Sequence, residues 1–233
     1  MLLRFASASL GALLLFAACG GDGSDYPDDR EDDAYDLEAM ALEDGDLPQG
    51  VEQRQAQSFD NAEWAEAFPN ADEDQLEVRK NQLDAQGRVK GFVAIFTWDA
   101  PIEHLGRPYQ YTSHSTLFVD TSKAIDSMTK FCDLPIDGTN PLKELRVPRM
   151  ADGSVGFQVS EKLENFGESI DTVVCFRTGR IVHAVVQSGL EGTADTGLSV
   201  RLARRMLAHV DDAFAQDAAD SDDDDEGDPT PGS

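Results

Sequence analysis

Positive charge is scarce in this sequence. Nineteen lysine and arginine residues stand against 45 aspartate and glutamate residues, which gives the 233-residue chain a formal net charge of −26 at pH 7. Proteins that bind nucleic acid present a basic surface to the phosphates, so this balance argues against a nucleic-acid partner. The chain also lacks a glycine-rich phosphate loop between a strand and a helix, so no nucleotide or other cofactor is predicted.

Histidine and the common catalytic motifs are scarce as well. The four histidines are scattered singly without the spacing of metal ligands, so no metal site is predicted. Ser154 and Ser188 adjoin glycines, yet neither lies in the Gly-x-Ser-x-Gly pattern of a nucleophile elbow. A hydrolase would need a site built from distant residues, with a serine or an aspartate beside His183 or His114. This remains the alternative to a protein without catalytic activity.

The first nineteen residues resemble an export signal. Arg4 precedes an apolar run from Phe5 to Phe16, which is too short for a membrane-spanning helix and is typical of a secretory signal peptide. Leu15-Phe16-Ala17-Ala18-Cys19 then resembles the lipobox of bacterial lipoproteins. That resemblance implies acylation of Cys19, which would anchor the chain in a bilayer. The other interpretation is an ordinary cleaved signal followed by an incidental cysteine.

The acidic residues gather toward the two ends of the chain. Residues 20–46 hold twelve carboxylates against the single Arg30, and residues 217–233 hold eight carboxylates and no basic residue. Both stretches are poor in apolar side chains, which predicts disorder. The expected organisation is a signal peptide at 1–18, a lipid-anchored acidic linker at 19–46, a folded domain at 47–216 and a disordered acidic tail at 217–233.

The middle of the chain predicts consecutive strands separated by helices. Helices are expected at 60–68, 72–87, 120–132 and 195–214 from capping aspartates and helical spacing of apolar residues. Strands are expected at 88–98, 109–119, 155–159, 170–176 and 180–187 from alternating or continuous apolar residues. This order favours the α+β class, with an antiparallel β-sheet covered by helices.

Two cysteines and three aromatic residues are candidate structural or binding residues. Cys132 and Cys175 could form a disulfide in an exported protein, or could be two separately buried small side chains. Trp98, Tyr109 and Tyr111 lie on neighbouring predicted strands. They could present an aromatic binding platform, or they could belong to the core.

The layout also resembles a known group of domains. The segments that carry the resemblance are Asp46-Leu47-Pro48-Gln49-Gly50-Val51, Gly91-Phe92-Val93-Ala94-Ile95-Phe96, Leu117-Phe118-Val119-Asp120-Thr121 and the stretch from Val173 to Val182. They are similar to uncharacterised bacterial lipoproteins with a domain like the PsbP, Mog1 and LpqN group. The resemblance implies an α/β/α sandwich and a binding or assembly role, but it assigns no functional residue.

These observations lead to one expected function. The chain is expected to be a lipid-anchored, non-catalytic binding or accessory protein on the extracytoplasmic side of the bacterial cell envelope. Its partners would be the bilayer, through Cys19, and an unknown envelope protein or small ligand.

Overall fold

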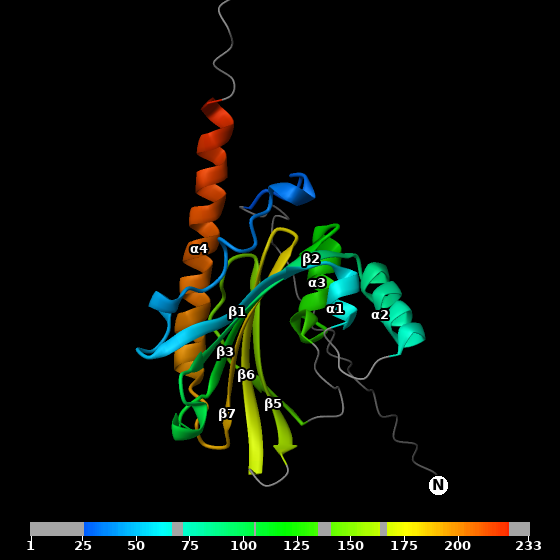
Figure 1. Ribbon diagram of the computed structural model, residues 1–233. Coiled ribbons are helices and arrows are strands. Elements are labelled where there is room, and N and C mark those ends of the chain that lie inside the picture. The colour runs from blue at the N-terminus through cyan, green and yellow to red at the C-terminus, as the bar shows by residue number, and fades with distance from the viewer. Residues whose placement is uncertain (1–25, 67–71, 105, 135–140, 164–166, 224–233) are drawn as a thin grey trace, which may run out of the picture.

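The computed structural model describes residues 26–66, 72–104, 106–134, 141–163 and 167–223 (Figure 1). Within them, seven strands form one antiparallel sheet in the order β1-β2-β3-β7-β6-β5-β4. The strands are β1 (Val51–Phe59), β2 (Arg88–Trp98), β3 (Gln110–Phe118), β4 (Leu142–Leu145), β5 (Gly153–Leu163), β6 (Gly167–Thr178) and β7 (Ile181–Leu190). The helices are α1 (Asn61–Glu66), α2 (Glu73–Ala85), α3 (Thr121–Met128) and α4 (Thr196–Asp223). The expected α+β class is therefore confirmed.

Helix α4 covers one face of the sheet (Figure 1). Its apolar side chains recur at helical spacing, so they form one stripe that packs on alternate residues of the strands. Leu202 and Met206 are fully buried and belong to one core cluster with Phe96 of β2, Phe176 of β6 and Val185 of β7. This cluster fixes α4 across the centre of the sheet.

The segment before β1 completes the same core, which corrects the prediction of an acidic linker at 19–46. Tyr35, Leu37, Met40, Ala41 and Leu42 are all at most 5% exposed and lie in the α4 cluster. The prediction is wrong for residues 26–46 because it relied on the number of carboxylates and neglected the apolar residues between them, which are the ones that pack into the core. The folded unit therefore begins well before residue 47.

Arg180 ties this N-terminal segment to the hairpin between β6 and β7. Its guanidinium pairs with Asp32 at 2.6 Å and donates to the carbonyl of Arg30 and to the hydroxyl of Tyr35. It also donates to the carbonyl of Phe118 at 3.1 Å. A planar group with five donors can hold several acceptors at once, so this one side chain links the segment, the hairpin and β3.

Helices α1, α2 and α3 lie on the other side of the sheet (Figure 1). Ala124 of α3 packs on a second core cluster that includes Phe118, Val173 and Val182. Asp120 caps α3 by accepting a hydrogen bond from the Lys123 amide at 2.8 Å. Helices on both faces fit the expected sandwich arrangement, while the particular resemblance stays a prediction.

Several elements differ from the sequence prediction. Strands β1 and β4 were not expected, because β1 is an edge strand whose interior residues are exposed and, apart from Ala56, polar, and β4 has only four residues. Helix α3 ends at Met128 and not at Cys132, and β5 is longer than the predicted 155–159. Helix α4 continues to Asp223, so residues 217–223 are helical where a disordered tail was predicted. The rest of that tail, residues 224–233, lies outside the described residues, as do the signal peptide and Cys19. None of the described helices is both long enough and apolar enough to cross a membrane.

Candidate binding site beside helix α3

A cavity of about 300 Å³ lies where α1, α2 and α3 meet the end of β3. Trp64 of α1, Leu83 of α2, Phe118 of β3 and Leu134 beyond α3 supply apolar walls, and the polar or charged residues of the lining include Ser127 and Asp133. Concave sites with mainly apolar walls and a few polar groups are the usual form of small-ligand sites, whose volumes begin at about 300 Å³. This cavity is therefore the candidate binding site.

The end of α2 is held close to the start of α3 by Gly87. Its φ of 77° favours glycine, and a Cβ there would lie 2.7 Å from Cγ of Lys123 and 2.9 Å from Cγ2 of Val119. The Gly87 carbonyl also accepts a hydrogen bond of 2.8 Å from the Val119 amide. This close approach sets the separation of two walls of the cavity.

Trp64 is held in place by a stack of rings. Its ring centroid lies 4.4 Å from that of Phe59 and 5.3 Å from that of His114, with interplanar angles of 16° and 15°. The guanidinium carbon of Arg88 lies 4.7 Å from the centroids of both Phe59 and Trp64. Such cation–π contacts strengthen when they are buried, so Trp64 forms a fixed wall.

Arg88 and Asp133 form a buried ion pair behind this wall. Nε of Arg88 lies 3.3 Å from Oδ2 of Asp133, and the two side chains are 0% and 6% exposed. Thr116 donates a hydrogen bond of 2.8 Å to the same carboxylate oxygen. Burial lowers the pKa of Arg88 and raises that of Asp133, while the charge of Arg88 opposes the rise.

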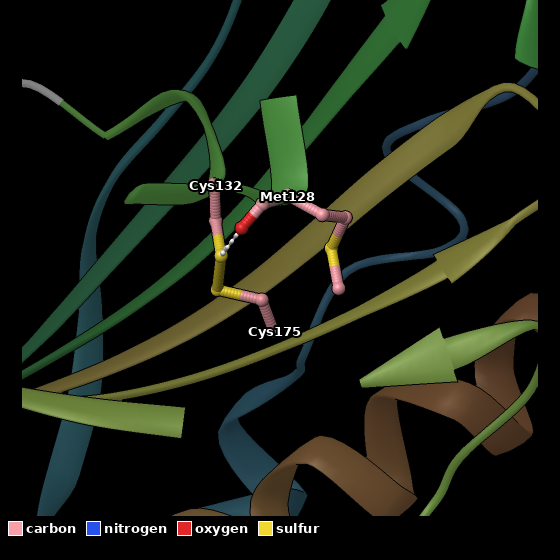
Figure 2. Close-up of a disulfide and its surroundings, with 3 residues drawn as sticks. All are labelled: Met128, Cys132 and Cys175. Carbon is pink, nitrogen blue, oxygen red and sulfur yellow. Dashed lines mark hydrogen bonds between the residues drawn. A yellow bond between two sulfur atoms is a disulfide. The ribbon is translucent and has the colours of Figure 1, made fainter. Parts of the chain in front are cut away.

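A disulfide holds Asp133 in this position. It joins Cys132, in the turn after α3, to Cys175 of β6 (Figure 2). Phe131, Cys132 and Asp133 have φ values of 59°, 59° and 61°, a left-handed run that costs energy in residues with a Cβ. The covalent link to β6 and the Arg88–Asp133 pair retain the turn, which forms one wall of the cavity.

The polar groups of the cavity are divided between its interior and its mouth. Ser127 is buried, and its hydroxyl has no hydrogen-bond partner within the described part of the chain. Lys130 and Asp126 are exposed, and Lys123 is half-buried, with Nζ 3.4 Å from the carbonyl of Ala85. Asp133 is paired with Arg88, and Lys123 and Lys130 are balanced by Asp126 on the lining and by Asp120 at the start of α3, so these charges sum to zero.

The two histidines of the hydrolase alternative do not meet. Ser115 of β3 lies directly opposite His183 of β7 in the register, so these two side chains are on the same face of the sheet. His114 is the neighbour of Ser115 in the strand, so its imidazole is on the other face. His183 contacts Ser115 Oγ through Nδ1 and Thr178 Oγ1 through Nε2, both at 2.9 Å. Burial lowers the pKa of each histidine to about 3, and Arg88 also lowers that of His114.

The Ser115–His183 pair is therefore a poor nucleophile and base. Both residues are at most 1% exposed, and the second nitrogen of His183 meets a threonine rather than an orienting carboxylate. A neutral imidazole in this setting satisfies buried hydroxyl groups. The pair does not supply the accessible nucleophile that the hydrolase alternative requires.

The aromatic platform predicted from Trp98, Tyr109 and Tyr111 is not present. Trp98 and Tyr111 are 4% and 1% exposed and belong to the α4 core, and burial raises the pKa of Tyr111 to about 12. The Trp98 indole donates to the carbonyl of Pro108 at 2.9 Å. Tyr109 is half-buried and its hydroxyl lies 2.9 Å from Ser169 Oγ. Trp98 and Tyr111 therefore belong to the core, and Tyr109 lies at its edge.

Sequence reasoning missed the residues of the cavity. Trp64, Leu83 and Ser127 belong to three separate helices, and no local motif joins them. Asp133 had a weak signal, because it follows a cysteine that was a disulfide candidate. No group of three or more histidine, cysteine, aspartate or glutamate side chains that could hold a metal ion occurs among the described residues.

Comparison with known proteins gives little further information. No family model matches the chain, and no curated protein is significantly similar to it. Among solved structures, the extracellular domain of PknH from Mycobacterium tuberculosis aligns with a TM-score of 0.44 and 9% identity, over 74% of this chain and 95% of that one. A likeness of this extent carries no conclusion about function.

Proposed function

We propose that this chain is a non-catalytic binding protein of the bacterial cell envelope that takes a small ligand in the cavity beside α3. The observation that carries the proposal is the cavity itself, whose apolar walls come from Trp64, Leu83, Phe118 and Leu134. A ligand that buries apolar surface against these walls gains free energy in proportion to the area removed from water.

The walls of the cavity are preorganised for binding. The disulfide, the Arg88–Asp133 pair and the stack on Trp64 each fix one wall before a ligand arrives. A site that needs no reordering loses less free energy on binding, so useful affinity requires fewer contacts. This arrangement favours ligand binding over a site that forms only around a partner.

The proposal includes anchoring through Cys19 on the extracytoplasmic side of the membrane. The packing of residues 26–46 shortens the tether expected from the sequence, because only seven peptide units separate Cys19 from Tyr26. At about 3.5 Å for each unit, the reach is at most about 25 Å. The domain would therefore work next to the bilayer, where confinement raises its effective concentration toward ligands or partners at that surface.

A fragment screen tests the proposed function. The chain from residue 19, with Cys19→Ser to avoid lipid, would be screened for fragments that raise its melting temperature. Ser127→Trp should fill the cavity and abolish those shifts, whereas Ile125→Trp, at a side chain that is 48% exposed on the same helix, should retain them. Fragments that bind both variants equally, or no binding fragment at all, would contradict the proposal.

A further inference from the structure

The balance of charges around the cavity and one buried carboxylate on its lining define the class of ligand that it takes. Resting on the proposed function, we propose that the cavity binds an uncharged molecule with an aromatic or apolar body beside Trp64 and a hydrogen-bond donor that meets the Asp133 carboxylate. The donor is a hydroxyl or an N–H group at the inner end of the ligand.

The absence of charge on the ligand follows from the even division of the charged groups in and beside the lining. Three positive and three negative side chains make up this set: Lys123, Lys130 and Arg88, and Asp120, Asp126 and Asp133. An ion that enters the cavity loses hydration and finds no excess of the opposite charge, so its transfer from water is unfavourable. An uncharged molecule avoids this loss.

The inward donor follows from the position of Asp133. Its side chain is 6% exposed, whereas Lys130 and Asp126 are exposed and mark the mouth of the cavity. The contacts from Arg88 and Thr116 both reach the same carboxylate oxygen, Oδ2. A carboxylate offers about four lone-pair sites on its two oxygens, so it can accept a further hydrogen bond. Paired with Arg88, it is ionised and has no proton to give, so the ligand must supply the donor.

Arg88 brings this acceptor close to the aromatic wall. Its guanidinium carbon lies 4.7 Å from the centroid of the Trp64 ring, and its Nε lies 3.3 Å from Oδ2 of Asp133. Trp64 and Asp133 therefore flank one guanidinium, and both line the cavity. One small molecule can bury its body beside the indole and direct a polar hydrogen at the carboxylate.

The two tryptophans of the chain provide a direct readout. Trp64 lines the cavity, while Trp98 is buried in the α4 core with its indole N–H bonded to Pro108. In ¹H–¹⁵N NMR spectra each indole gives its own side-chain signal, and Trp64→Phe identifies them. A ligand in the cavity should shift the Trp64 signal and leave the Trp98 signal in place.

The experiment titrates the chain from residue 19, with Cys19→Ser, with probes that share the indole ring. Indole and 1-methylindole differ in the N–H donor, and we expect indole to bind with a Kd at least about five-fold lower, because a hydrogen bond to a charged group is stronger than average. Indole-3-ethanol, indole-3-acetate and tryptamine differ in charge at nearly equal size. We expect indole-3-ethanol to bind at least about five-fold more tightly than either ion.

Matched variants locate the acceptor. Asp133→Asn should reduce the preference for indole over 1-methylindole to about two-fold or less, because a neutral amide accepts a weaker hydrogen bond than a carboxylate. Asp126→Asn removes the same charge at the exposed mouth and should leave the preference unchanged. If Asp133→Asn does not fold, which loss of the native Trp98 signal would reveal, the probe comparison on the unsubstituted cavity decides alone.

Several results would overturn the inference. They are equal Kd values for indole and 1-methylindole, a charged probe that binds as tightly as indole-3-ethanol, and equal changes in the two aspartate variants. If one of these occurs while Ser127→Trp abolishes binding, the ligand class is wrong and the proposed function stands. If no probe shifts the Trp64 signal, or only the Trp98 signal shifts, the inference is also overturned, and the fragment screen decides the proposed function independently.

Discussion

Removing residues 26–46 should unfold the domain, because this segment supplies part of the core under α4. Leu37, Met40 and Leu42 are at most 5% exposed. Burial of such side chains contributes about 1.5–3 kcal/mol each, or about 4.5–9 kcal/mol for the three. The net stability of a domain is about 5–15 kcal/mol, so a chain that begins at residue 47 should retain little or none.

Single substitutions measure the contribution of this segment to the stability of the core without deleting it. Leu42→Ala should lower the free energy of unfolding by about 2–5 kcal/mol, because it leaves a void in a packed core. Glu38→Ala, at an exposed position of the same segment, should change it by less than about 0.5 kcal/mol. Urea denaturation followed by far-UV circular dichroism measures both changes.

Two results would refute this reasoning. The first is cooperative unfolding of the chain that begins at residue 47 at the same urea midpoint as the longer chain. The second is a loss below about 1 kcal/mol for Leu42→Ala, which would mean that the segment does not contribute to the core.

Three other measurements test separate parts of the structure. Replacing Cys132 and Cys175 with serine should lower the free energy of unfolding by about 4 kcal/mol, from the chain entropy of a link between residues 43 apart; unchanged urea unfolding would contradict this. Because burial lowers the pKa values of His114 and His183 from 6.5 to about 3, only the unfolded chain gains these protons as the pH falls below 6.5. The free energy of unfolding should then fall by up to about 1.4 kcal/mol per pH unit for each histidine, and equal urea midpoints at pH 6.5 and pH 4.5 would contradict this. Finally, detergent partitioning should place the expressed protein in the detergent phase and its Cys19→Ser variant in the aqueous phase, and identical partitioning would argue against lipidation.

Local patterns predicted much of the fold. Asp72 and Asp120 cap α2 and α3 as expected, because a carboxylate that accepts from the first turn of a helix is encoded within four residues. Strand β2 covers the predicted residues 88–98, because its alternating and apolar residues are also local. Features of this kind need no knowledge of distant contacts.

The remaining features depend on contacts that no local pattern contains. Composition predicts an acidic spacer for the N-terminal segment. The ion pair that helps to hold this segment on the domain joins Asp32 to Arg180, almost 150 residues later, so no local pattern reveals it. Trp64 of α1 and Ser127 of α3 line one cavity although more than 60 residues separate them, and Gly87 allows the end of α2 to approach the start of α3 beside it. Composition alone therefore gave the wrong domain boundary and no indication of the binding site.

The most direct test of the central claim is a crystal structure of the chain grown with a fragment that the thermal screen identifies. We expect density for the fragment between Trp64 and Phe118, with the Arg88–Asp133 pair unchanged. An empty cavity in a crystal that holds the fragment elsewhere would contradict the account.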